Sequence, residues 1–127
     1  MRWRALFVIA AVLLLPGCRG EEEPPLSHGK PVDYWLGQLK KPDPKLRKRA
    51  VAALGHVGTA DPAVLPALQE AVKDRAAAVR DEAVLALFNI GPEAMEAVET
   101  LRKAEEDKDP IVRAHATTAL ERILSGK

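Results

Sequence analysis

Cysteine and aromatic residues are scarce in this chain of 127 residues. The single Cys excludes an internal disulfide framework and a cysteine-rich zinc site. Phe, Trp and Tyr together make up 4% of the residues, so a core must be built from Ala, Leu, Val and Ile, which favours helices over a β-sandwich. Neither sign of charge dominates, because 19 Lys and Arg stand against 18 Asp and Glu, and this balance argues against a dedicated nucleic-acid binder. The length is that of one domain.

Residues 1–17 have the pattern of a secretory signal peptide. Arg2 and Arg4 give a basic start, an unbroken apolar run covers residues 5–15, and Gly17 is a small residue before a cleavage point. Such a run rises only about 16 Å as a helix, which is short for a membrane span. An uncleaved anchor is the alternative interpretation. Cleavage would leave 17 basic and 18 acidic residues in the mature chain.

The four residues Leu15-Pro16-Gly17-Cys18 resemble the lipobox of bacterial lipoproteins. In that family the Cys is acylated and becomes the first residue of the mature chain. The resemblance therefore implies cleavage after Gly17 and a lipid attached to Cys18, and more than one acyl chain gives stable membrane anchoring. It also implies a location in the bacterial cell envelope, on the periplasmic side.

Residues 18–30 are predicted to be a disordered tether that begins at the lipidated Cys18. Charged residues, Pro and Gly dominate this segment, and it has too few apolar residues to join a core. The folded domain is expected over residues 31–127. It is expected to open with a helix over residues 31–40, in which Val32, Trp35 and Leu36 share one apolar face that covers the next element.

The chain repeats itself with a period of 33 residues. The aligned positions include an arginine (Arg47, Arg80 and Arg113) and a leucine (Leu54, Leu87 and Leu120). Apolar residues in the first copy follow helical spacing at positions 46, 50, 53, 54 and 57. A second helix follows in the first two copies, after the stop signals of Gly55 and Gly58 and, one period later, of Gly91. Each unit is therefore predicted to be a helical hairpin.

The third copy contains only a first helix. Thr117 and Thr118 replace apolar residues at the aligned positions of the second copy. This polar substitution predicts that the last helix faces water as a cap. Pairing of its uncovered face with another chain is the alternative.

The recurring string Pro44-x-Leu46-Arg47-x-x-Ala50-x-x-Ala53-Leu54-x-x-Val57-Gly58 resembles HEAT repeats, most closely the short type found in phycobilisome lyases. The resemblance covers residues 42–124, about two and a half repeats. It implies an all-α fold, a short α-solenoid of helical hairpins with the helix over residues 31–40 as an N-terminal cap. It also implies a non-catalytic scaffold or interaction module for a protein partner that the sequence does not name, because this fold alone does not specify an activity.

The resemblance further implies that partners bind along the second helices of the hairpins, on the concave face. The candidate contact residues are Gln69, Glu70, Lys73, Glu96, Glu99 and Lys103. A solvated helix face is the alternative for this set. The in-phase arginines are interpreted as structural, since HEAT-like repeats use such an Arg in an inter-repeat ladder with acidic groups.

A basic run leaves open a third possibility, a structural envelope protein that lies on lipid. Its six basic residues are Lys40, Lys41, Lys45, Arg47, Lys48 and Arg49. Contact with anionic headgroups would be worth up to ~1 kcal/mol per residue close to the membrane surface. A solvated face is again the alternative.

An enzyme or enzyme subunit of a HEAT-like family is the remaining alternative. Deoxyhypusine hydroxylase binds its iron with repeated His-Glu dipeptides, whereas here His56 precedes Val57 and His115 precedes Ala116. Phycobilin lyases are much longer than this chain. We therefore expect no catalytic residue, no metal ligand, no cofactor and no nucleic-acid partner.

Overall fold

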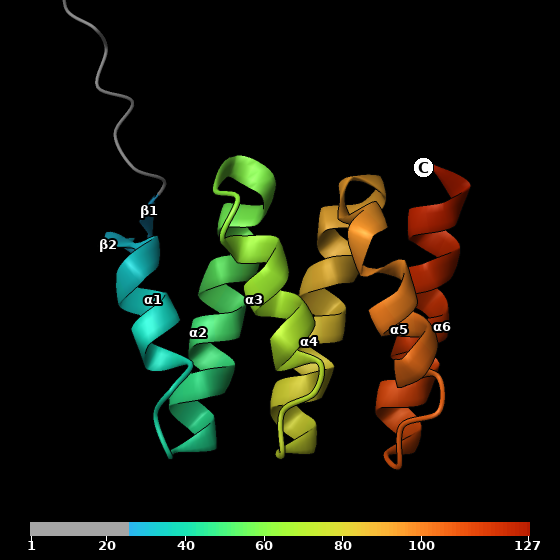
Figure 1. The fold of residues 1–127 in the computed structure, drawn as a ribbon, viewed down its shortest axis with the longest axis horizontal. Helices are drawn as coiled ribbons and strands as arrows, with labels where there is room; N and C mark the ends of the chain where they lie inside the picture. Colours follow the sequence, from blue (N-terminus) through green and yellow to red (C-terminus); the bar gives the residue numbers. More distant parts are fainter. Residues whose placement is uncertain (1–25) are drawn as a thin grey trace, which may run out of the picture.

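The computed structural model describes residues 26–127, and its elements stand side by side in a row (Figure 1). The predicted signal peptide, Cys18 and the tether up to residue 25 lie outside the described residues. In chain order the elements are β1 (Leu26–Ser27), β2 (Lys30–Pro31), α1 (Val32–Gln38), α2 (Pro44–Val57), the 3-10 helix η1 (Gly58–Ala60), α3 (Val64–Ala71), α4 (Ala77–Ile90), the 3-10 helix η2 (Gly91–Ala97), α5 (Val98–Ala104) and α6 (Pro110–Ser125).

The long helices begin and end at signals that recur along the chain. Asp43 caps α2 by accepting a hydrogen bond from the Lys45 amide at 2.9 Å, and Asp109 caps α6 in the same way. A proline follows each Asp at the first helical position. Gly58 and Gly91 end α2 and α4 with φ of 58° and 71°, a backbone conformation that favours glycine. The chain therefore turns sharply at the same point of two successive repeats.

The helices form two layers (Figure 1). α2 packs against α4 and α4 against α6, while α1, α3 and α5 lie on the other side and pack against α2, α4 and α6. α3 reaches the second hairpin through α4 and η2. This arrangement confirms the predicted all-α solenoid of stacked hairpins.

The core consists of aliphatic side chains at the repeated positions. Leu54 and Leu87 are completely buried and Leu120 is 6% exposed. The aligned alanines are buried in all three repeats, at positions 50, 83 and 116 and at positions 53, 86 and 119. Small side chains at these positions let the first helices approach each other closely.

Gly55 contributes to the same close approach and does not end a helix as expected. It lies inside α2, and a Cβ atom placed on it would come within 2.9 Å of the Ala86 Cβ in α4. The helix continues for two more residues because Gly58 provides the terminating conformation. Gly55 therefore allows close packing between α2 and α4, and Gly58 ends the helix.

The N-terminal part of the domain begins earlier than predicted. Residues 26–31 form a short antiparallel hairpin, in which Leu26 pairs with Pro31, where disorder was expected up to residue 30. The Trp35 indole Nε1 donates a hydrogen bond of 3.0 Å to the buried Ser27 carbonyl, which fixes the hairpin to α1. The expected helix over residues 31–40 is confirmed in a shorter form, Val32–Gln38.

Leu46 departs from the expected apolar face, because its side chain is 39% exposed while the aligned Val79 and Val112 are fully buried. α4 packs against α2, and α6 packs against α4, so each has the first helix of the preceding repeat as a neighbour. α2 has no such neighbour and packs on that side against α1 and β1. At the other end, Thr117 and Thr118 are exposed, as expected for a helix that faces water. None of the helices in residues 26–127 combines the length and the apolar character needed to cross a bilayer.

Candidate functional site

Two arginine–aspartate pairs join successive repeats. Arg47 donates from Nε and Nη2 to the two carboxylate oxygens of Asp74, at 2.9 and 3.0 Å. Arg80 makes the same two bonds to Asp107, at 2.8 and 3.0 Å. Both arginines are almost completely buried. We call these two pairs the arginine ladder, and each joins the first helix of one repeat to the loop before the next by two parallel bonds.

Each ladder arginine also binds the loop that precedes its own helix. The Arg47 Nη1 donates to the carbonyls of Lys41 and Pro42, and the Arg80 Nη1 donates to the carbonyls of Asp74 and Arg75. One guanidinium therefore supports its own loop and the loop of the next repeat at the same time. Arg113 makes only the first kind of contact, to the Asp107 and Lys108 carbonyls, and is exposed.

The ladder keeps its carboxylates ionised. Burial by itself would raise the pKa of Asp74, but hydrogen bonds from Arg47 and from the Ala76 amide outweigh burial and lower this pKa. Burial and the Arg80 hydrogen bond act in the same opposed way on Asp107, whose pKa is also lowered. The hydrogen bond to Asp74 raises the pKa of Arg47 above its ordinary value. These groups are thus charged and mutually paired at neutral pH.

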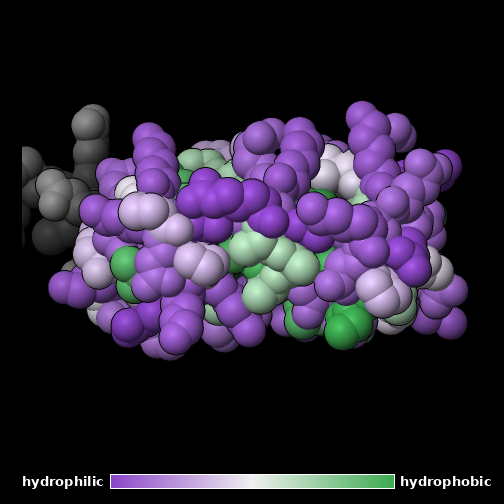
Figure 2. Space-filling model, turned by 90° about the horizontal axis from the view of Figure 1, so that it is seen from below, coloured by the Kyte–Doolittle hydropathy of each residue, from purple (hydrophilic) through white to green (hydrophobic). Residues whose placement is uncertain are grey.

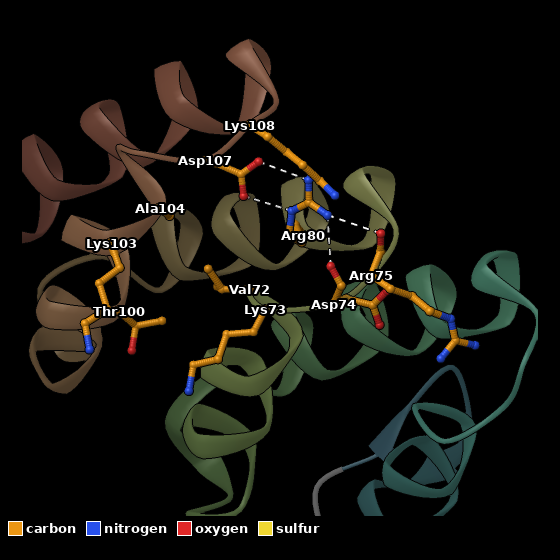
Figure 3. Close-up of a pocket in the computed structure, with 10 residues that line it drawn as sticks. All are labelled: Val72, Lys73, Asp74, Arg75, Arg80, Thr100, Lys103, Ala104, Asp107 and Lys108. Atoms are coloured by element: carbon orange, nitrogen blue, oxygen red, sulfur yellow. Dashed lines mark hydrogen bonds and ion pairs between the residues drawn. The ribbon is translucent and has the colours of Figure 1, made fainter.

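A groove opens between the end of α3 and α5, beside the ladder (Figure 3). Its volume is about 490 Å³. Figure 3 shows Lys73 and Lys103 extended on one side of the Arg80–Asp107 pair, with Arg75 on the other side. The residues that line it are Val72, Lys73, Asp74, Arg75, Arg80, Thr100, Lys103, Ala104, Asp107 and Lys108. We call it the α3–α5 groove.

The groove contains part of the surface predicted for partner binding. Lys73 and Lys103 line it, and Glu70 contacts Lys73 at its edge, with Oε1 and Nζ 3.1 Å apart. Gln69 lies next to α5, because its side-chain oxygen accepts a hydrogen bond from the Thr100 hydroxyl at 3.1 Å. The structure therefore brings Gln69, Lys73 and Lys103 to the junction of α3 and α5. Glu70 lines a separate hollow of about 130 Å³ together with Leu39.

Glu96 and Glu99 lie away from the groove. Glu96 lines a separate hollow of about 280 Å³ near the start of α3, together with Asp61 and Glu93. Glu99 is exposed on α5 and lines neither cavity. The predicted surface is thus divided into a basic part at one end of the second helices and an acidic part at the other end.

Sequence reasoning missed Arg75 and Lys108 in the groove and the aspartates of the ladder. The signal was present, because Arg75 and Lys108 are 33 residues apart, as are Asp74 and Asp107. The distance from Arg47 to Asp74 in the sequence, 27 residues, also recurs from Arg80 to Asp107. The charged residues of the groove and of the ladder thus follow the same 33-residue period as the apolar residues.

The basic run does not form a single surface. Arg47 is buried in the ladder, and the other five basic residues are exposed. Seen from the end at which the loops before α2, α4 and α6 lie, the molecule is mostly hydrophilic, with small hydrophobic areas (Figure 2). Lys48 has a distant acidic neighbour in Glu82, 3.9 Å away.

His56 and His115 have different neighbours. His56 lies edge-on to His28, with ring centroids 5.7 Å apart, whereas His115 contacts Asp81 on α4. Within residues 26–127, no three or more His, Cys, Asp or Glu side chains are grouped so that they could hold a metal ion.

Comparison with protein families gives a match over most of the domain. The model for HEAT repeats matches residues 32–121, which include the ladder, the α3–α5 groove and all of the helices up to the middle of α6. A search of curated proteins found no match. Because the family match covers more than two thirds of the chain and agrees with the stacked hairpins, the chain belongs to the HEAT repeat family.

Proposed function

We propose that this protein is a non-catalytic binding or scaffold module for another protein, anchored to a bacterial membrane by lipid on Cys18. HEAT repeats commonly mediate protein–protein interaction, and the stacked hairpins offer a continuous surface to which a partner can bind. The observation that carries the proposal is the distribution of charge. The buried arginines are committed to the ladder, whereas exposed basic residues on α5 and in the loops after α3 and α5 line a groove.

The proposed anchor is supported by the sequence Leu15-Pro16-Gly17-Cys18 after an apolar run. It would place the solenoid on the periplasmic side of the envelope, a few residues from the bilayer. The 33-residue period also supports the short repeat type found in phycobilisome lyases. We assign none of the lyase chemistry to this chain, because no catalytic constellation is found in its sequence.

The lipid anchor is tested by Cys18→Ser in the native host. The full chain should fractionate with membranes and incorporate a labelled fatty acid, and the variant should lose both properties because serine offers no thiol to acylate. Ser27→Ala is the matched control and should retain the label. Equal labelling of the Cys18→Ser variant would contradict the anchor.

Partner binding is tested by crosslinking in native membranes followed by mass spectrometry. The wild-type chain is compared with a variant that carries Glu96→Lys, Glu99→Lys and Lys103→Glu. A control with the same charge changes at exposed positions elsewhere carries Asp33→Lys, Glu121→Lys and Lys45→Glu. One protein captured by the wild type and the control, and lost in the first variant, is the expected result. No specific capture by any of the three would contradict the proposal.

A further inference from the structure

The α3–α5 groove carries positive charge that the domain does not neutralise. Its lining includes five basic residues and two carboxylates. We propose that this groove binds an acidic segment of the partner protein, whose carboxylates contact Lys73 and Lys103. The inference rests on the proposed binding function and names the chemistry of the partner and the place where it binds.

The two carboxylates of the groove are not available to its lysines. Asp74 and Asp107 each use both oxygens for a ladder arginine. Each also accepts a backbone amide two residues further on, at 2.8 Å. A carboxylate has about four lone-pair sites, and each of these two aspartates already uses three of them within the domain. The ladder therefore does not compensate the positive charge of Lys73 and Lys103.

The basic side chains are correspondingly free to bind a ligand. Among the described residues, Lys103, Lys108 and Arg75 form no ion pair with a carboxylate. Arg75 makes one long contact, 3.3 Å from Nη2 to the Pro42 carbonyl. Lys73 pairs with Glu70, but both side chains are more than half exposed, and such a pair contributes little in water. A carboxylate from a partner can replace Glu70 at little cost.

The shape of the groove suits a peptide chain. α3 meets the second hairpin through α4 and η2, and this leaves a recess of about 490 Å³ beside α5. Val72 and Ala104, both at most 5% exposed, give the recess an apolar floor beneath the basic rim. An extended segment that alternates acidic and apolar side chains can place its carboxylates at the basic rim and its apolar side chains on the floor. A flat bilayer surface would reach the rim but not this floor, so the geometry favours a peptide over lipid headgroups.

Acidic residues at the opposite end of the second helices limit where the acidic segment can bind. The hollow near the start of α3 contains Asp61, Glu93 and Glu96, which repel an acidic chain. Like charges facing each other across an interface disfavour the wrong orientation. The acidic part of the ligand is thereby confined to the α3–α5 groove.

The test measures peptide binding to the full chain in detergent micelles by fluorescence anisotropy. The probe is a labelled peptide of sequence Glu-Leu-Glu-Glu-Leu-Glu, and its neutral counterpart has Gln in place of every Glu. The protein variants are Lys73→Glu with Lys103→Glu in the groove and, as the matched control, Lys40→Glu with Lys45→Glu at exposed positions outside it. Circular dichroism melting checks that each variant is folded, and Lys73→Gln with Lys103→Gln replaces the first pair if it is not.

The wild-type chain should bind the acidic peptide at least about tenfold more tightly than the neutral one, with an affinity that falls as salt is added. The groove variant should lose at least about tenfold in affinity, because each reversed lysine removes a charge-assisted hydrogen bond. The control pair should change it less than about threefold. Equal binding of the two peptides, or an equal loss in the two variants, would overturn the proposal.

Vesicles that contain anionic lipid separate the peptide from a membrane surface. If the groove variant loses its preference for anionic over neutral vesicles and keeps its peptide affinity, the groove belongs to lipid headgroups and the proposal is wrong. Crosslinking in native membranes separates this inference from the proposed function. A partner that is captured normally by the groove variant would refute the groove and leave the binding module intact.

Discussion

Single residues set the spacing between repeats at two points, Gly55 and Arg80. At Gly55 the absence of a side chain lets α2 approach Ala86 of α4. At Arg80 one side chain joins two carbonyls of the loop before α4 to a carboxylate of the loop before α6. Both residues act at the joint between repeats, where a solenoid gains its stability from neighbours.

Gly55→Ala should destabilise the protein by about 1–3 kcal/mol, because the new methyl group would overlap the Ala86 Cβ and push α2 away from α4. Gly37→Ala is the matched control, since a Cβ atom there meets nothing within 4 Å and alanine favours a helix by up to ~1 kcal/mol. Urea denaturation of both variants measures the difference. A Gly55→Ala protein as stable as Gly37→Ala would contradict the close packing of α2 and α4.

Arg80→Leu should cost about 3–5 kcal/mol of folding free energy, because it leaves the largely buried Asp107 carboxylate without its partner. Arg113→Leu, at the aligned position one period later, should cost less than about 1 kcal/mol, since Arg113 is exposed and binds only loop carbonyls. Thermal melting compares the two. Similar losses would mean that the carboxylate bonds are not what stabilises the joint.

At the scale of elements, the sequence predicted the helices well because their apolar residues recur in phase. The first helices of the repeats, their ending at Gly58 and Gly91, and the burial of Leu54 and Leu87 all follow from spacing and from the conformation of glycine. The hairpin at residues 26–31 could not be predicted in this way. It is joined to α1 by a hydrogen bond from the Trp35 indole to the Ser27 carbonyl, and that bond leaves no periodic trace in the sequence.

The candidate site was predicted only in part, for a related reason. Positions on the second helices identify which side chains face outward, but they do not say which loop residues lie beside them. Arg75 and Lys108 enter the α3–α5 groove from the loops after α3 and α5. Their position depends on how the ladder holds those loops, which helical periodicity does not describe.

We expect the free energy of unfolding to depend on pH because of one aspartate in each of the loops before α4 and α6. Asp74 and Asp107 have lowered pKa values in the folded protein, so the stabilisation that they provide is complete above their ordinary pKa of about 3.9. It is lost as the pH falls through the lowered folded values, because the unfolded chain then binds protons more readily. Urea denaturation at a series of pH values from 7 to 3 measures this loss.

Asp74→Asn removes one of the titrating groups and should make the curve of stability against pH flatter below pH 4 than that of the wild type. Glu121→Gln, at an exposed position on α6, should leave the shape of that curve unchanged. Curves of equal steepness for the wild type and Asp74→Asn would show that the ladder does not control acid unfolding.

At the scale of the whole molecule, one hydrophobic core runs through all of the repeats. A disruptive substitution in the middle repeat should therefore destabilise the whole domain. Leu87 is fully buried in α4, the helix that contacts both α2 and α6. Leu87→Asp should abolish cooperative unfolding, because it places an unpaired charge in the core. Leu124→Asp is the control at a side chain that is 53% exposed, and it should melt like the wild type. A normal melt for Leu87→Asp would refute the repeat alignment.

The arginine ladder also has a direction, and this affects what two copies of the protein can do to each other. Within a chain, each ladder carboxylate lies 33 residues after the previous one, at positions 74 and 107. One period earlier the residue is Lys41, a cation. If the α6 end of one copy met the α1 end of another, Arg113 would face a lysine instead of an aspartate. The contact that lets repeats stack within one polypeptide thus opposes head-to-tail polymerisation into filaments, the hazard of open-ended surfaces of this kind.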